Sequence, residues 1–282
     1  MKHITLCADD YGQNLAVSQG IIALLRDNRL SATSCLTNAP EWPSHAKALL
    51  PFHGRADIGL HFNLTEGKAL SPAFIRHYGA TLLSLPVLMR KAYLRQLDSA
   101  AIEDECHAQL DQFVRAVGQL PDFIDGHQHV HQLPVVREVL VKVCASRFQG
   151  HCFYMRCVND KLTATDWLQG QWLKKSIILL STPWFQRLLR HVQIPHNQSF
   201  SGIYSFAKAK DYRAIFPHFL DMTKEDGLIL CHPGLDSSAV DDSIAWVRGY
   251  EYRYLSSEQF LQDCAQRNIV ISRFNYVRCL KT

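Results

Sequence analysis

The chain has 282 residues, of which 47% are hydrophobic and 20% are charged, a composition typical of a globular protein with a large apolar core. The formal net charge is +4 and the basic residues are scattered, which argues against a nucleic-acid-binding protein. The apolar stretches fall far short of the roughly 18 residues that a membrane-spanning helix needs. We therefore expect no nucleic-acid partner and no stable membrane insertion.

The cysteines and the amino-terminal residues bear on the cellular compartment. Nine cysteines are dispersed along the chain, without a Cys-x-x-Cys pair. This pattern argues against a disulfide framework or a zinc finger and predicts reduced, buried thiols, with Cys7 and Cys231 in the core. Asp9 and Asp10 interrupt the first apolar run, so no secretory signal segment is expected. Together these features predict a cytoplasmic protein.

The first half of the chain alternates between strand-like and helix-like segments. Compact apolar runs indicate strands, and apolar residues three or four positions apart indicate helices. Strands are expected at residues 3–8, 32–37, 57–64 and 121–125, and helices at residues 17–25, 44–50, 102–117 and 135–143.

The second half continues this alternation after an irregular stretch. Strands are expected at residues 152–156, 227–231 and 269–272, and helices at residues 212–220 and 256–267. Ser256 and Gln259 have the spacing of a capping box, which predicts that the last helix begins at Ser256. Residues 160–200 are the least regular part and are expected to form an insertion or lid, helical in part, over one face. Strands that alternate with helices predict an α/β fold with a mostly parallel sheet.

Polar side chains that could bind a metal ion or transfer a proton lie at the ends of these predicted strands. In a parallel barrel or an open α/β sheet the carboxyl ends of the strands meet on one face, which carries the active site. The residues at or just past such ends are Asp9, Asp10, His61, Asp125, His127, Arg156 and His232.

These residue types suit a hydrolytic metal site. One carboxylate and two imidazoles can hold a divalent cation and leave positions open for water and substrate. A second carboxylate can accept a proton from that water, and a histidine from another strand can protonate the leaving group. Asp9 and Asp10 alternate faces in an extended strand, which favours one ligand and one base. Taken singly, an Asp-Asp pair before Gly12 is also typical of a turn.

Several short blocks of this sequence occur together in the order of a known family. They are Ala8–Gly12, Thr33–Asn38, Gly59–Leu64, Asp125–His131, Cys231–Gly234 and the carboxyl-terminal residues Arg248, Glu251 and Leu255-Ser256. In this order they resemble the YdjC-like carbohydrate deacetylases, which include the chitooligosaccharide deacetylases. The chain departs from the family pattern at Tyr11, where Phe is usual, and at Phe62-Asn63, where aliphatic residues are common.

The resemblance implies a single-domain irregular (β/α) barrel over residues 1–282, with mostly parallel strands. It implies a carbohydrate N-deacetylase that uses one divalent metal ion, magnesium or zinc, to activate water. By the same resemblance, Asp10, His61 and His127 are the metal ligands. Asp9 is the general base and His232 is the general acid.

Four other polar residues at or near the predicted strand ends are expected to have supporting roles. Asp125 is expected to hold His127 in the correct tautomer, as carboxylates next to metal ligands commonly do. Arg156 is expected to orient Asp9 or Asp10. His129 and His131 are expected to pack against the site or to support its ligands.

The expected substrate is an N-acetylated mono- or oligosaccharide, and a homodimer is expected because similar proteins are often dimers. Two other functions remain open. A metal-dependent phosphoesterase would favour two metal ions about 3.5–4 Å apart with bridging carboxylates, for which the sequence offers few extra acids. A non-catalytic, metal-stabilised sugar-binding protein would use the same ligands without turnover.

Overall fold

The computed structural model describes residues 1–160, 179–237 and 242–275. In this part of the chain, eight parallel strands form a single sheet in the order β5-β4-β3-β2-β1-β7-β6, and β8 also pairs with β1. The strands are β1 (Lys2–Tyr11), β2 (Ala32–Cys35), β3 (Asp57–Phe62), β4 (Phe123–Gly126), β5 (Tyr154–Met155), β6 (Phe200–Ser201), β7 (Gly227–Cys231) and β8 (Ile269–Ile271).

The sheet curls until its two edges approach each other. Met155 of β5 forms an isolated parallel bridge with His196, which precedes β6, and the Met155 amide donates to the Pro195 carbonyl at 3.0 Å. β5 and β6 have only two residues each, so far fewer residues pair where the two edges meet than around β1. The result is the irregular, mostly parallel barrel that the sequence predicted.

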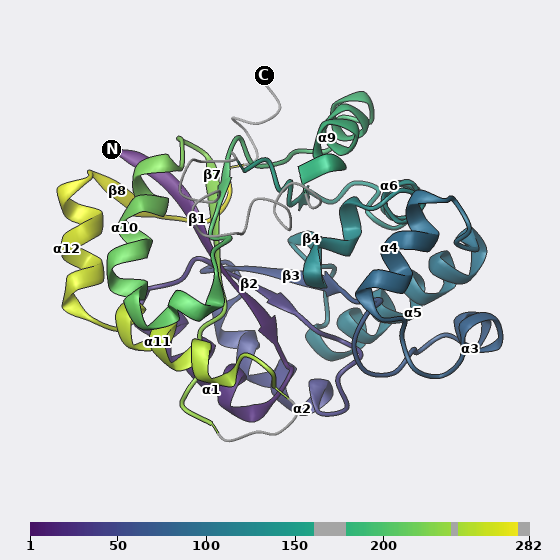
Figure 1. Cartoon of the computed structure of the whole chain (residues 1–282), viewed down its shortest axis with the longest axis horizontal. Coiled ribbons are helices and arrows are strands. Elements are labelled where there is room, and N and C mark those ends of the chain that lie inside the picture. Colours follow the sequence, from purple (N-terminus) through teal and green to yellow (C-terminus); the bar gives the residue numbers. More distant parts are fainter. Residues whose placement is uncertain (161–178, 238–241, 276–282) are drawn as a thin grey trace.

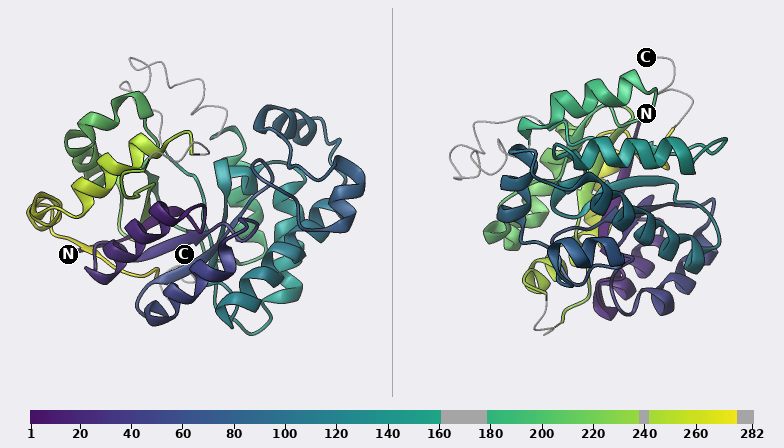
Figure 2. Two further views of the ribbon diagram at one scale, coloured as in Figure 1. Left: turned by 90° about the horizontal axis from the view of Figure 1, so that it is seen from below. Right: turned by 90° about the vertical axis from the view of Figure 1, so that its right-hand side faces the viewer.

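Helices follow most strands and cover the outside of the curled sheet (Figures 1 and 2). The long α5 packs against α3, α6 and β3, and α11 packs against α1 and α10. The α-helices are α1 (Leu15–Arg26), α2 (Trp42–Ala46), α3 (Pro72–Tyr78), α4 (Leu85–Tyr93), α5 (Ser99–Val117), α6 (Val136–Arg147), α9 (Thr182–His191), α10 (Tyr212–Met222), α11 (Ala245–Leu255) and α12 (Glu258–Gln266). The 3₁₀ helices are η1 (Lys47–Phe52), η2 (His127–Gln132) and η3 (Phe206–Asp211). In the described segments, no helix is both long and apolar enough to cross a membrane.

The helix boundaries follow local capping chemistry, with one correction to the sequence prediction. α5 ends at Gly118, as predicted, because glycine readily adopts the left-handed conformation found there (φ 85°). α12, however, begins after Ser257, whose side chain accepts from the Phe260 amide, so the capping box predicted at Ser256 is wrong. Ser256 has helical backbone angles because it ends α11, a helix that the periodicity did not reveal.

The core predictions hold with one exception among the thiols. Cys7 and Cys231 are buried in adjacent strands, as expected, and most of the described cysteines are buried with them. Cys152 is exposed, because β5 begins two residues later than the predicted strand and leaves Cys152 in the preceding loop. Of the insertion expected at residues 160–200, residues 161–178 lie outside the described residues. α9 occupies part of the remainder, and the role of this segment as a lid stays a prediction.

Candidate metal centre and active site

Three buried side chains from different elements meet at the carboxyl ends of the central strands. Asp10 comes from β1, His61 from β3, and His127 from the first position of η2, directly after β4. Asp10 Oδ1 lies 3.0 Å from His127 Nδ1 and 3.4 Å from His61 Nε2. One ligand atom from each residue lies within 4.8 Å of the others. The structure therefore brings together the three residues that the sequence proposed as metal ligands.

An irregularity in β1 separates the two neighbouring aspartates. The parallel register with β2 shifts between Ala8 and Tyr11, and Asp10 has a left-handed backbone (φ 68°). Such a bulge re-aims a side chain, and aspartate tolerates this conformation better than most residues. The strand continues to Tyr11, beyond its predicted end, and the Tyr11 hydroxyl donates to the His45 carbonyl at 2.7 Å. The bulge thus turns the Asp10 side chain towards His61 and His127.

Asp9 forms a two-pronged ion pair with Arg156. Arg156 Nη1 donates to Asp9 Oδ2 at 2.7 Å, and Nη2 donates to Asp9 Oδ1 at 2.5 Å. Burial alone would raise the pKa of Asp9, but the adjacent Arg156 guanidinium outweighs burial and holds that pKa well below its usual range. Asp9 therefore stays ionised at neutral pH. Of the two aspartates that Arg156 was predicted to orient, Asp9 is the one it binds.

Asp10 has a different cationic partner, Arg248 of α11. Arg248 Nη2 donates to Asp10 Oδ2 at 2.9 Å, and Arg248 Nε donates to Asp242 Oδ2 at 2.7 Å. One oxygen of Asp10 is thus held by Arg248 while the other faces the two histidines. Burial would raise the pKa of Asp10, but Arg248 and the histidines keep it well below its usual range.

Asp125 contacts His61 rather than His127, so the predicted Asp125–His127 pair is wrong. The Asp125 Oδ1 atom lies 2.6 Å from His61 Nδ1, and the Ser34 hydroxyl also hydrogen-bonds Asp125. The reason is strand register, because Asp125 of β4 is paired directly with His61 of β3. Because Asp125 contacts Nδ1 of His61, the other ring nitrogen, Nε2, faces Asp10. His127 instead has Glu66 near its second nitrogen, with Glu66 Oε2 3.3 Å from His127 Nε2.

His232 directly follows β7, and its backbone is anchored to α11. The His232 amide donates to Glu251 Oε2 at 2.6 Å, and the Tyr204 hydroxyl donates to Glu251 Oε1 at 2.7 Å. Phe206 packs edge-on against the imidazole, with ring centroids 5.6 Å apart. Within the described residues, His232 Nδ1 is buried and has no hydrogen-bond partner. A positive charge on His232 would lower the pKa of Asp9, so the two groups are electrostatically close.

His129 and His131 lie away from the triad. His131 Nε2 is 2.9 Å from the Arg156 carbonyl, and its ring packs edge-on against Phe185. The His129 ring packs edge-on against Phe200. Burial lowers the pKa of His131 to about 4, so its ring is neutral at physiological pH. Left-handed backbone angles at Gln128 and His129 turn the chain between His127 and His131 (φ 52° and 62°).

The donors of the triad fit a divalent cation. Two imidazole nitrogens and one carboxylate oxygen are typical ligands of a metal ion that keeps positions open. A second cluster of Cys7, Asp9 and Asp125 has similar spacing, but it surrounds the Arg156 guanidinium. Arg156 Nη2 lies 3.1 Å from Cys7 Sγ and 2.6 Å from Asp125 Oδ2. A cation already fills that cluster, so the triad is the better candidate for a metal.

A family model described as YdjC-like protein matches residues 3–266. The chain belongs to this family. The YdjC-like chain is 35% identical over 147 residues to a carbohydrate deacetylase of Danio rerio, a match that covers 50% of this chain and 45% of that protein. It is also 35% identical over 143 residues to a chitooligosaccharide deacetylase of Proteus mirabilis, covering 49% and 55%. The chain thus matches about half the length of these relatives.

Two further comparisons cover almost the whole YdjC-like chain. A chitooligosaccharide deacetylase of Yersinia pestis is 24% identical over 282 residues, covering 97% of this chain and 98% of that one. A crystal structure from Enterococcus faecalis, of a protein whose name refers to cellobiose-phosphate cleavage, superimposes with a TM-score of 0.74 at 18% identity, covering 98% of each chain. The family and the fold predicted from the sequence are both confirmed.

Three residues of this YdjC-like site had no predicted role. Arg248 and Glu251 belong to the carboxyl-terminal family block, which was the only signal for them. Glu66 lies five residues after His61 in a loop, and nothing in its spacing points to His127, which is 61 positions further along the chain.

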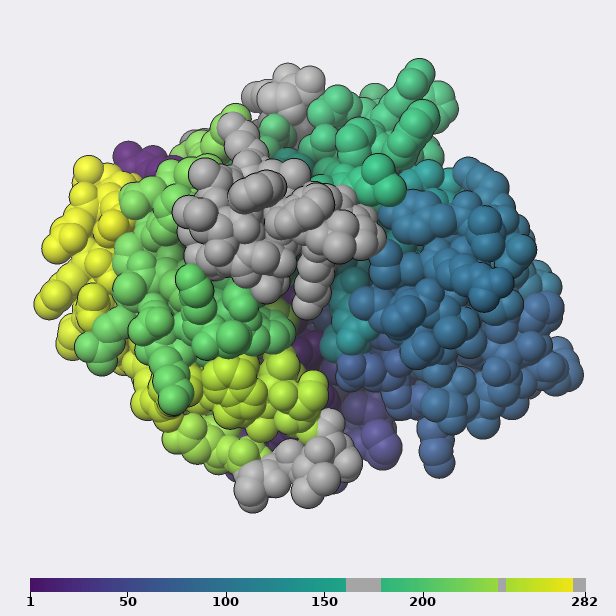
Figure 3. Space-filling view, in the orientation of Figure 1, coloured from purple at the N-terminus to yellow at the C-terminus, as the bar shows by residue number. Residues whose placement is uncertain are grey.

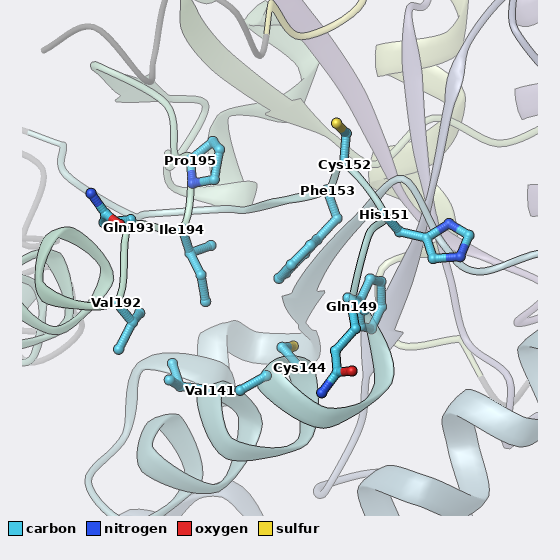
Figure 4. Close-up of a pocket in the computed structure, with 12 residues that line it drawn as sticks. Val141, Cys144, Gln149, His151, Cys152, Phe153, Val192, Gln193, Ile194 and Pro195 are labelled. Carbon is cyan, nitrogen blue, oxygen red and sulfur yellow. The ribbon is translucent and has the colours of Figure 1, made fainter.

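Two hollows are lined by different parts of the YdjC-like chain. Figure 3 shows a depression between the blue helical region and the yellow-green residues, with purple and teal residues at its floor. A separate cavity of about 310 Å³ is lined by the end of α6, residues 148–153 and residues 192–195 (Figure 4). This cavity precedes β5 and β6, at the amino ends of the strands, and no predicted catalytic or metal residue lines it.

Proposed function

We propose that this YdjC-like protein is a metal-dependent hydrolase that removes the acetyl group from an N-acetylated amino sugar. The observation that carries this proposal is that two adjacent aspartates have different partners. Asp10 joins His61 and His127, whereas Asp9 remains outside the triad and is kept ionised by Arg156. A ligand set with a separate ionised carboxylate nearby suits hydrolysis by activated water. The names of the relatives support the acetylated sugar as the substrate class.

Asp10, His61 and His127 would hold the divalent ion, magnesium or zinc. When bound, the ion would supply Lewis-acid chemistry, polarising the acetamide carbonyl and lowering the pKa of water. Asp125 and Ser34 hold His61 with Nε2 towards the ion, and Arg248 holds Asp10 with Oδ1 towards it. Each ligand is thus presented by a fixed partner.

Asp9 and His232 would carry the protons of the reaction. Asp9 accepts a proton from the attacking water, because its oxygens retain lone pairs beside the bonds to Arg156. His232 donates a proton to the amide nitrogen as the bond between carbonyl carbon and nitrogen breaks. The products are acetate and the free amino sugar.

The phosphoesterase alternative fits the described residues less well. A second metal ion would need further carboxylates next to the triad. Of the carboxylates around the triad, Asp9 and Asp125 are both ion-paired with Arg156, and Glu66 is half-exposed beside the second nitrogen of His127. The expected homodimer and cytoplasmic location stay predictions.

An acetate-release screen tests the proposed function. Purified protein stripped with a chelator should release no acetate from N-acetylglucosamine and its oligomers. Addition of magnesium, zinc or manganese should restore release, with one ion bound per chain. Full activity of the stripped protein, or release of phosphate from phosphate esters instead of acetate, would contradict the proposal. Sugar binding without acetate release by metal-loaded protein would favour the non-catalytic alternative.

His232→Ala should lower turnover by about 10²–10⁴-fold, the usual contribution of general acid catalysis. Folding and metal binding should persist, because His232 is only half-buried and lies outside the triad. The matched control is His151→Ala, which removes an exposed histidine at the opposite end of the barrel.

An acetyl ester with a good leaving group tests the same assignment chemically. p-Nitrophenolate leaves without needing a proton, so the loss caused by His232→Ala should be much smaller with p-nitrophenyl acetate. Equal losses on the sugar amide and on the ester would remove His232 as the acid.

A further inference from the structure

Glu66 is held beside the triad by a preorganised loop. Asn63, a buried residue directly after β3, accepts from the Thr65 amide at 2.9 Å and from the Glu66 amide at 3.1 Å. The Asn63 side-chain amide donates to the Glu66 carbonyl at 2.8 Å. These three bonds fix the backbone of Glu66, whose side chain is half-exposed at the rim of the site. Asn63 thus places an acid next to His127.

The two nitrogens of His127 face different partners. Nδ1 lies 3.0 Å from Asp10 Oδ1, on the side of the triad. Nε2 is buried and forms no hydrogen bond of good geometry, yet Glu66 Oε2 lies 3.3 Å from it. A buried imidazole nitrogen without a partner is costly, and this separation is within reach of a hydrogen bond.

We propose that Glu66 is a positioning residue of the metal centre and acts through His127. Its carboxylate accepts a hydrogen bond from the Nε2–H of His127 and thereby leaves the Nδ1 lone pair free to bind the ion. This inference rests on the proposed metal-dependent function. Glu66 does not bind the same ion itself, because it lies on the opposite side of the imidazole ring from Asp10.

The two histidine ligands then have carboxylate partners that differ in their exposure to solvent. His61 binds through Nε2 and is supported at Nδ1 by Asp125, which is fully buried. His127 binds through Nδ1 and is supported at Nε2 by the half-exposed Glu66, whose other oxygen accepts from Gln128 Nε2 at 2.9 Å. The second pair is nearer to solvent, so Glu66 can be substituted with less disturbance of the fold than the buried Asp125.

Metal titration of the full-length apoprotein tests this role without any activity measurement. Glu66→Ala should weaken binding of zinc or manganese by about 10–100-fold, as expected for loss of a carboxylate that supports a histidine ligand. Glu66→Gln should recover part of the affinity, because its amide oxygen can still accept from Nε2–H. The control Glu258→Gln removes an 80% exposed acid paired with Arg29 and should leave affinity unchanged. Equal affinity of wild type and Glu66→Ala would overturn the proposal.

Nitrogen-15 NMR of histidine-labelled, zinc-loaded protein gives the second readout. The His127 ring, assigned with the His127→Gln variant, should carry its proton on Nε2, and that signal should shift in Glu66→Ala. A proton on Nδ1 would overturn the proposal.

The outcomes also separate this inference from the deacetylase proposal. A wild type that binds no metal would overturn both. Wild type that binds metal without releasing acetate, combined with weak binding by Glu66→Ala, would overturn the activity and support Glu66.

Discussion

Asp9→Asn should lower acetate release by about 10²–10⁴-fold, the usual range for loss of a general base, while the protein still binds one metal ion. Asparagine keeps the size of the side chain but cannot accept the proton of the attacking water as a carboxylate can. Metal binding should persist because Asp10, His61 and His127 are unchanged. The measurement combines turnover on an N-acetylated saccharide with metal content per chain.

Two comparison variants make the Asp9 result specific. Asp221→Asn removes an acid that is ion-paired with Arg267 on the surface, and its turnover should equal that of the wild type. Asp10→Asn should lose metal and turnover together, because Asp10 belongs to the triad. If Asp9→Asn retains wild-type turnover, Asp9 is not the base. If it loses metal as completely as Asp10→Asn, Asp9 belongs to the metal-binding set.

Arg156→Met should destabilise the fold by about 3–5 kcal/mol, the usual cost of removing one partner from a buried ion pair. The Arg156 guanidinium is fully buried and lies within 2.7 Å of both Asp9 and Asp125. Methionine fills similar space but leaves these two carboxylates close together without a cation. The loss is a large fraction of the 5–15 kcal/mol that stabilises a typical domain. Denaturant unfolding of the apoprotein measures it.

A second substitution should partly reverse this loss. Arg156→Met combined with Asp125→Asn removes one of the two unpaired carboxylates, so the double variant should be more stable than Arg156→Met alone. Arg267→Met, which breaks a surface pair with Asp221, serves as the control and should cost less than about 1 kcal/mol. A similarly small cost for Arg156→Met would show that the buried cluster does not depend on its cation.

Much of this architecture could be predicted from local patterns in the sequence. Helical spacing and compact apolar runs predicted the strands around β1 and the long helix that ends at Gly118, because side-chain periodicity depends on neighbouring residues alone. Several elements were not predicted in this way. β6 has two residues and α11 carries both site residues and exposed ones, so neither shows a clear apolar period.

The residue types of the candidate site were predictable for a similar reason. Carboxylates and histidines at the ends of parallel strands are expected to meet, because those ends share one edge of the sheet. Asp10, His61 and His127 do meet there. Their assignment as ligands came from the family resemblance, since spacing alone left the choice among the three histidines of the Asp125–His131 segment open.

The sequence by itself thus determined that Asp10, His61 and His127 gather at this edge, and the tertiary structure decided which neighbouring groups they touch. Asp125 supports His61 because β3 and β4 pair in that register, and Asp10 turns away from Asp9 because β1 bulges. Arg248 reaches Asp10 across 238 residues of sequence. Such contacts depend on strand register, backbone irregularities and long-range packing, which no local pattern of residues encodes.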